Sequence, residues 1–146
     1  MNASIEDLAE VRRLSAIWAL RLTQGDIHEV MEHVFTADGT YSAFGQTYGL
    51  EDWPALVEAA PSGLFLTGEP VIELDGDSGT GTGEVPMLFI DQTNHHMRMG
   101  WYTDTYERTA KGWRLKTRGM TFLRRHGGAD SGKPHDPLRP EPTSAP

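Results

Sequence analysis

Polar and hydrophobic residues alternate most regularly between His96 and Arg125. Two runs rich in Tyr, Trp, Thr and Met flank a short turn that contains Gly112, a pattern typical of a long β-hairpin. Side chains alternate across a strand, so the first run has one polar face. That face consists of His96, Arg98, Gly100, Tyr102, Asp104, Tyr106 and Arg108. It can be interpreted as a strand surface with a structural ion pair between Asp104 and Arg118, or as the floor of a pocket.

Helical spacing of apolar residues dominates the N-terminal part of the chain. Residues 4–24 predict a helix that begins with a capping box, because Ser4 is followed three residues later by Asp7. A second helix is predicted from Asp26 to Phe35, and a third from about residue 51 to residue 60. Residues 36–39 are interpreted as a turn, and residues 40–43 and 46–48 as a short hairpin.

Strand patterns dominate the remainder of the chain. Residues 64–74 and 77–90 predict two paired strands, and the hairpin of residues 96–125 follows. Helices therefore come first and strands afterwards, which indicates an α+β fold with three N-terminal helices packed in a strongly bent, mostly antiparallel sheet. Residues 1–126 are expected to form this domain. Residues 127–146 are rich in Gly and Pro and are expected to form a flexible tail.

Amino-acid composition indicates which kinds of binding partner and cellular location to expect. The net charge of −8 disfavours binding to nucleic acid or to an anionic membrane surface. Cysteine is absent, which excludes disulfides and a thiol nucleophile. The N-terminus lacks the apolar segment of a signal peptide, and no apolar run reaches membrane-spanning length. We therefore expect a cytoplasmic protein.

Motifs for most kinds of catalysis are missing. Gly79, Gly81 and Gly83 lack dinucleotide-binding spacing, and their bare strand face suggests close packing by a helix or a ligand instead. The histidines do not have helical metal-ligand spacing, so no metal site is expected. There is no nucleophile elbow. The groups left for acid–base chemistry are Asp104, Tyr102, Tyr106, Tyr41, His96 and Arg118.

Three phrases of the sequence together resemble the SnoaL-like branch of the nuclear transport factor 2-like superfamily. They are Gln24-Gly25-Asp26 after the first helix, residues 34–41 (VFTADGTY), and residues 101–109 (WYTDTYERT) with the following GWRL. The resemblance covers residues 4–125. It implies a cone-shaped α+β barrel with a deep pocket, frequent homodimers, and cofactor-free proton transfer on hydrophobic substrates, as in scytalone dehydratase, ketosteroid isomerase and polyketide cyclases.

The resemblance transfers the family's site residues only in part. Dehydratase-like members have a Tyr and an Asp near the end of the first helix, where this chain has Trp18 and Thr23. They have a His at the start of the third strand, where this chain has Leu64. Asp104 and Arg118 match the family pattern. The usual His–Asp dyad is therefore expected to be absent.

Two classes of function follow, and the first is a cofactor-free lyase or isomerase acting on a small hydrophobic substrate. Asp104 would then be the base or orient one, Arg118 would stabilise negative charge, and Tyr102 or Tyr41 would donate a hydrogen bond, with His96 as a substitute acid or base. The second class is a non-catalytic ligand-binding or interaction module, which the missing dyad favours. An epoxide hydrolase ranks lower because it needs two carboxylates. Of these classes, the sequence favours the enzyme over the binding module.

Two further expectations concern surfaces. An apolar pocket is predicted, lined by Trp18, Leu22, Phe35, Tyr41, Phe44, Trp53, Leu64, Tyr102, Met120 and Phe122, for a small hydrophobic partner. The outer face of the hairpin is predicted to carry Met97, Met99, Trp101, Leu115 and Leu123 and to mediate a homodimer.

Overall fold

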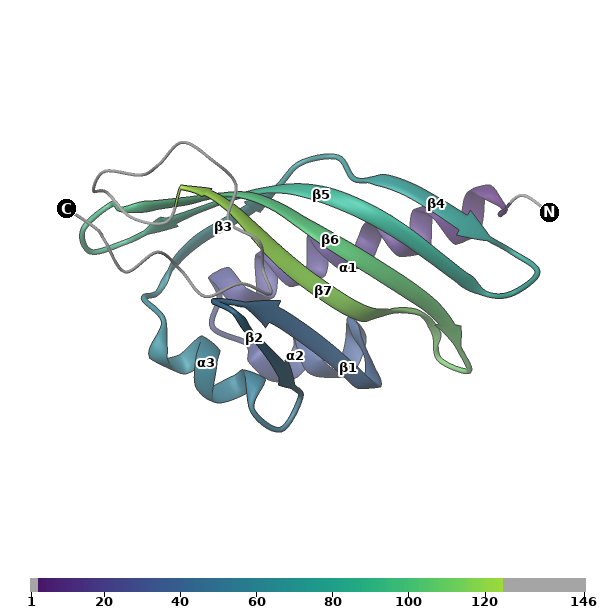
Figure 1. Cartoon of the computed structure of the whole chain (residues 1–146), viewed down its shortest axis with the longest axis horizontal. Helices are drawn as coiled ribbons and strands as arrows, with labels where there is room; N and C mark the ends of the chain where they lie inside the picture. The colour runs from purple at the N-terminus through teal and green to yellow at the C-terminus, as the bar shows by residue number, and fades with distance from the viewer. Residues whose placement is uncertain (1–2, 125–146) are drawn as a thin grey trace.

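The structure of the protein is a computed structural model that describes residues 3–124. Within this range the chain forms three helices and seven strands (Figure 1). The helices are α1 (Ile5–Thr23), α2 (Ile27–His33) and α3 (Trp53–Ala59). The strands are β1 (Phe35–Ala43), β2 (Gln46–Gly49), β3 (Gly63–Thr67), β4 (Val71–Asp75), β5 (Thr80–Asp91), β6 (Met97–Thr109) and β7 (Gly112–Arg124).

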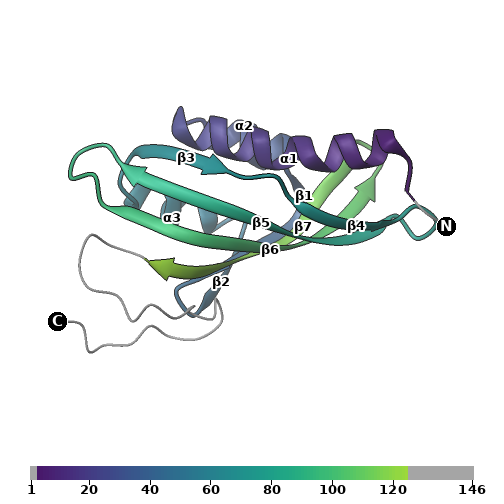
Figure 2. The same cartoon turned by 90° about the horizontal axis from the view of Figure 1, so that it is seen from above.

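All seven strands belong to one curled sheet that is not closed into a barrel. The strand order is β2-β1-β7-β6-β5-β3, and β4 pairs with the other half of β5. Helix α1 lies lengthwise against one face of the sheet (Figure 2). This arrangement confirms the predicted α+β cone with helices packed in a bent, mostly antiparallel sheet. The exception to antiparallel pairing is β1 against β7, which is parallel.

Local interactions fix the ends of the first two helices. Ser4 Oγ accepts a hydrogen bond from the Asp7 backbone N at 3.1 Å, and Asp7 accepts one in return, which is the predicted capping box. Asp7 also accepts a bond from Trp113 Nε1 at 2.9 Å, which attaches the start of α1 to β7. Gly25 has a φ of 75° and ends α1. Asp26 then caps α2 by accepting a bond from the Glu29 backbone N.

Two predicted element boundaries are wrong. Residues 36–39 are not a turn, because β1 already begins at Phe35 and contains them. The strand has an irregular register against β7 between Phe35 and Thr40, and this irregularity accommodates the Asp38-Gly39 step. Residues 64–74 do not form one strand, because residues 68–70 (Gly-Glu-Pro) separate β3 from β4. Proline cannot donate to a strand ladder, which explains the break.

The predicted hairpin is β6 and β7, and its face alternation is largely as expected. Tyr102, Asp104 and Tyr106 are buried, whereas Thr103 is exposed. Leu115, however, was predicted on the outer face and is fully buried. The pairing of β6 with β7 shifts register between Thr105 and Tyr106, so that Lys116 is the extra residue on β7. A bulge of this kind reverses which side chains face inward.

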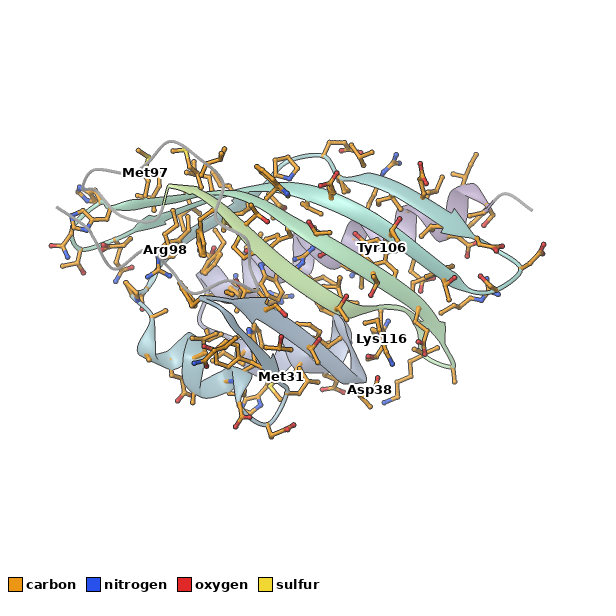
Figure 3. The ribbon with its side chains drawn as sticks, in the orientation of Figure 1. Met31, Asp38, Met97, Arg98, Tyr106 and Lys116 are labelled. Atoms are coloured by element: carbon orange, nitrogen blue, oxygen red, sulfur yellow. The ribbon has the colours of Figure 1, made fainter. Side chains whose placement is uncertain are left out.

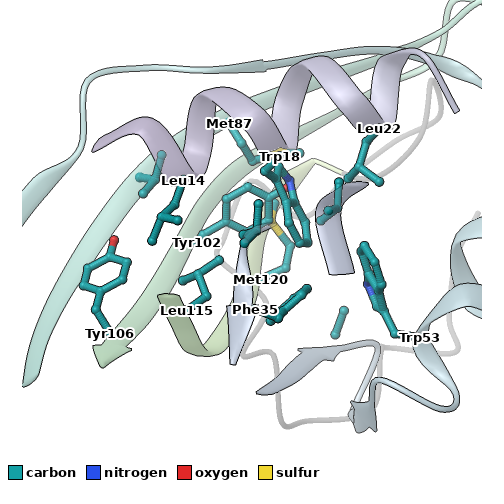
Figure 4. Packing of buried hydrophobic residues seen from close by; sticks show 14 of the residues in the cluster. Leu14, Trp18, Leu22, Phe35, Trp53, Met87, Tyr102, Tyr106, Leu115 and Met120 are labelled. Atoms are coloured by element: carbon teal, nitrogen blue, oxygen red, sulfur yellow. The ribbon is translucent and has the colours of Figure 1, made fainter. Parts of the chain in front are cut away.

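The core lies between α1 and the concave face of the sheet (Figure 4). Trp18 of α1 is at its centre, with ring-centroid distances of 5.8 Å to Phe35, 5.4 Å to Trp53 and 5.4 Å to Tyr102. Contacts of this geometry add to the free energy gained by burying the rings. In residues 3–124, no helix combines the length and apolar character that crossing a bilayer requires.

Candidate ligand-binding site

A cavity of about 440 Å³ lies between α1, α3 and one end of the sheet. Its wall is dominated by aromatic and aliphatic side chains: Trp18, Leu22, Tyr41, Phe44, Trp53, Phe65, Met87, Phe89, Tyr102, Met120 and Phe122. Exposed residues near its mouth come from the turn after α1, from the end of α3 and from the segment joining α3 to β3; they include Gly25, Glu58 and Ser62. The volume and lining are typical of a site for one small ligand.

Most of the residues predicted to line a pocket do line this cavity, but Phe35 and Leu64 do not. Phe35 is buried behind the wall, where its ring packs against Trp18 and Trp53. Leu64 is 44% exposed and is on the outer face of β3. The prediction failed for Leu64 because strand alternation points its neighbour Phe65 inward instead.

Two phenols supply polar groups to the cavity. The Tyr102 hydroxyl accepts a hydrogen bond from Trp18 Nε1 at 3.0 Å. Burial raises the pKa of Tyr102 to about 12, although Arg118 and the bond from Trp18 oppose this effect. Burial, with a smaller contribution from Tyr102, also raises the pKa of Tyr41 well above its usual value. Both phenols are therefore neutral hydrogen-bond donors at physiological pH.

Asp104 and Arg118 form a buried ion pair outside the cavity lining, and each side chain is fully enclosed. Arg118 Nε donates to Asp104 Oδ1 at 2.8 Å and Arg118 Nη2 donates to Asp104 Oδ2 at 2.8 Å. Tyr106 Oη donates to Asp104 Oδ2 at 2.8 Å, and Arg118 Nη2 also donates to Ser15 Oγ at 2.8 Å. The carboxylate therefore has three donors.

Aromatic rings complete the surroundings of the pair. The Arg118 guanidinium lies 4.2 Å from the centroid of Tyr102 and 4.7 Å from that of Trp18. Burial lowers the pKa of Arg118, but the charge and hydrogen bonds of Asp104 outweigh this effect and raise it overall. Among the described residues, Arg118 Nη1 has no hydrogen-bond partner. Asp104 therefore lies behind the Trp18–Tyr102 wall and does not line the cavity, whereas it was predicted on the pocket floor.

His96, predicted at the edge of the pocket, lies elsewhere. It is exposed, precedes the first residue of β6 and does not line the cavity. Strand β6 begins at Met97, one residue later than the alternation suggested. The turn that precedes the strand passes through His95, which has a φ of 59°, and His96 joins this turn to the strand. Within residues 3–124, no three His, Cys, Asp or Glu side chains are grouped so that they could hold a metal.

Thr23, at the family's usual Asp position, links two elements. Its hydroxyl donates to the Ala19 carbonyl at 2.7 Å and accepts from the Phe65 backbone N at 2.9 Å. This places β3 against the end of α1. With Leu64 facing outward, neither position of the usual dyad presents an acid or base to the cavity.

Arg98 lines the cavity, although it was not among the predicted site residues. It lies near the start of β6, at the end of the sheet close to α3, whereas Tyr106 lies toward the other end of the same strand (Figure 3). Among the described lining residues it carries the only positive charge and Glu58 the only carboxylate. An epoxide hydrolase would need a pair of carboxylates, which the described lining does not provide. Alternation alone placed Arg98 on the correct face, but it could not show which end of the strand faces a cavity.

Comparisons with solved structures show the same fold. A protein of unknown function from Mycobacterium tuberculosis aligns with a TM-score of 0.69 and 21% identity, covering 85% of this chain and 73% of that one. A candidate aromatic ring hydroxylase from Novosphingobium aromaticivorans aligns with a TM-score of 0.70 and 19% identity, covering 87% and 96%. A candidate scytalone dehydratase from the same organism aligns with a TM-score of 0.67 and 15% identity, covering 78% and 82%.

Comparison with curated proteins gives no match. The family described as the SnoaL-like domain matches residues 3–119, which is most of the chain. Neighbouring structures include proteins described as having nuclear transport factor 2-like and cystatin-like folds, in agreement with the curled sheet and its packed helices. The chain therefore belongs to the SnoaL-like domain family.

Proposed function

We propose that the protein binds a small, mostly apolar molecule in the cavity and holds an oxygen atom of that molecule with Tyr41 and Tyr102. The observation that carries this proposal is unused hydrogen-bonding capacity on both phenols. Among the described residues, the Tyr41 hydroxyl makes no hydrogen bond and is not one of the fully enclosed atoms, so it is open to the cavity that Tyr41 lines, and the Tyr102 hydroxyl only accepts. An unmade hydrogen bond in apolar surroundings is costly, so a ligand acceptor at this point is favoured.

The chemistry of the two phenols specifies the kind of oxygen. Both are neutral donors because burial raises the pKa of each. They therefore match a carbonyl, ether or hydroxyl oxygen that can accept. The surrounding rings of Trp18, Trp53 and Phe122 match a flat apolar body.

A matched pair of probes tests the proposal. Acetonaphthone carries a carbonyl, and ethylnaphthalene has nearly the same shape without it; binding of each is followed by tryptophan fluorescence. We expect the ketone to bind more tightly, and Tyr41→Phe to weaken ketone binding by about 3- to 10-fold without affecting the hydrocarbon. Tyr48→Phe is the matched control, because Tyr48 is on β2 and does not line the cavity. Equal affinity of wild-type protein for both probes, or no binding of either, would contradict the proposal.

A cofactor-free lyase or isomerase is the second candidate, and the donor arrangement favours it. Neutral phenols in an apolar cavity stabilise an oxyanion that develops during proton removal beside a carbonyl. The candidate scytalone dehydratase among the structural neighbours supports the same class of reaction. Within the described lining, the base would be Glu58, which is exposed near the mouth.

Proton exchange distinguishes the two candidates. An enzyme of this class would exchange the hydrogens next to the carbonyl of bound acetonaphthone with deuterium from D₂O. Glu58→Gln would slow this exchange about 100-fold or more if Glu58 is the base. Unaltered ligand hydrogens after prolonged incubation would leave binding alone as the function.

A further inference from the structure

We propose that the cavity selects a ligand bearing an anionic oxygen group such as a carboxylate, and that Arg98 is the residue that binds this group. The inference rests on the proposed function, because it specifies the ligand of the same cavity.

Arg98 is held at the cavity wall by the sheet. It pairs in register with Phe89 of β5, and both side chains line the cavity. Its guanidinium carbon is 5.5 Å from the centroid of the Phe89 ring. Stacking on a ring leaves the edge of the guanidinium and its N–H groups free to donate.

The charge of Arg98 is not neutralised within the part of the chain that the structure describes. No carboxylate of residues 3–124 is within 4.0 Å of its guanidinium, and it has no hydrogen-bond partner there. The carboxylate that acts on its pKa is Asp91. Asp91 Oδ1 already accepts bonds from the backbone N atoms of Thr93 and Asn94, at 2.7 and 2.9 Å.

Other arginines show that unpaired guanidinium groups are not general in this protein. Arg12 lies 3.1 Å from Glu69, and Arg118 pairs with Asp104. Arg108, on the same strand as Arg98, donates to the Gly76 carbonyl at 2.9 Å. Arg98 instead brings an uncompensated cation to the wall of an aromatic cavity.

Such a cation favours an anionic ligand. Partial desolvation is costly for a charge without a partner, and a carboxylate forms short charge-assisted bonds to guanidinium. Burial lowers the pKa of Arg98, partly offset by Tyr41, Asp91 and Tyr102, but arginine remains protonated near neutral pH. Tyr41, Arg98 and Tyr102 all line the same cavity, so one ligand can meet all three groups. The structure thus fits a small aromatic or alicyclic carboxylate.

The test compares naphthoate with naphthamide, which have the same ring system and differ in charge. Wild-type protein should bind naphthoate at least about 10-fold more tightly than naphthamide. Arg98→Gln should remove this preference, because it should weaken naphthoate binding much more than naphthamide binding. Arg98→Lys should retain a reduced preference, because it preserves the charge. Thermal unfolding of each variant verifies that it is folded.

Arg108→Gln is the matched control. Arg108 is on the same strand, also stacks on an aromatic ring, and lies outside the cavity lining. The control should keep the wild-type preference. Equal affinities of wild-type protein for naphthoate and naphthamide would overturn the assignment of Arg98, and so would a preference that survives Arg98→Gln. If acetonaphthone still binds in that case, the proposed function stands and only the anionic specificity fails.

Discussion

At the scale of single residues, Tyr102, Asp104 and Tyr106 share one strand face but have different surroundings. Tyr102 reaches the cavity, whereas Asp104 and Tyr106 support it from behind. Alternation could predict that all three point inward, because it depends only on the backbone period. It could not predict which of them meets empty space. That depends on where α1 and α3 cover the sheet, which is a property of tertiary packing.

The first prediction concerns the stability supplied by Asp104. Asp104→Asn leaves the Arg118 charge buried without a counter-ion and should lower the free energy of unfolding by about 3–5 kcal/mol. The double variant Asp104→Leu/Arg118→Met should lose much less than the sum of the single changes, because it removes both charges. Chemical denaturation measures both effects. An Asp104→Asn protein of wild-type stability would show that the ion pair does not stabilise the fold.

The second prediction is a loss of stability at alkaline pH. Tyr102 has its pKa raised to about 12 in the folded protein, and an unfolded tyrosine titrates near 10. The folded state therefore keeps the phenolic proton longer, so its stabilising contribution is full below pH 10 and is lost between about pH 10 and 12. Urea unfolding across this range should show a decrease. The free energy of unfolding of Tyr102→Phe should decrease less steeply with pH. The same decrease in both proteins would refute the raised pKa of Tyr102.

At the scale of elements, the sequence predicted regular features better than interruptions. The capping box, the glycine after α1 and the long hairpin were all predicted, because each depends on neighbouring residues. The bulge at Lys116 was not predicted, because it depends on register against another strand. The break between β3 and β4 was also missed, although the local sequence of residues 68–70 (Gly-Glu-Pro) signals it. Close packing is present at the glycine-rich strand, but the neighbouring strands β4 and β6 supply it and not the predicted helix or ligand: Leu74 lies against Gly81 and Tyr106 against Gly83.

The third prediction tests that close packing. A Cβ at Gly83 would lie 2.7 Å from Tyr106 Oη and 3.1 Å from the Val71 carbonyl oxygen. Gly83→Ala should therefore displace Tyr106 from Asp104 and lower the free energy of unfolding by about 1–3 kcal/mol. Thr82→Ala is the control, since Thr82 is the exposed neighbour on the same strand. Unchanged melting of Gly83→Ala would show that the Tyr106 contact is dispensable.

At the scale of the whole molecule, the outer face of the sheet carries an apolar patch. Two rows cross strands β3, β5 and β6 in register: Leu64, Ile90 and Met97, then Leu66, Leu88 and Met99. Leu64 and Leu66 are the most exposed of these residues, and Trp101 and Leu123 extend the patch. Leu115, which was predicted to belong to this face, is buried. We propose that two copies of the chain associate through this face.

The fourth prediction follows from that patch. Light scattering at micromolar concentration should give a dimer, and Leu66→Lys should give a monomer by placing a charge in the interface. Val71→Lys is the control, because Val71 is an exposed apolar residue of β4, away from the two rows. A wild-type monomer would contradict the proposal.

The claim on which the account depends most is that the aromatic cavity is the ligand site. Protein labelled at its tyrosine rings and methionine methyl groups, titrated with acetonaphthone and followed by NMR, tests it within one sample. We predict ring-to-ligand contacts and shift changes for Tyr41 and Tyr102, which line the cavity, and none for Tyr48 and Tyr106, which do not. Contacts of the probe with the outer-face methionines Met97 and Met99, with Tyr41 and Tyr102 unaffected, would contradict the account.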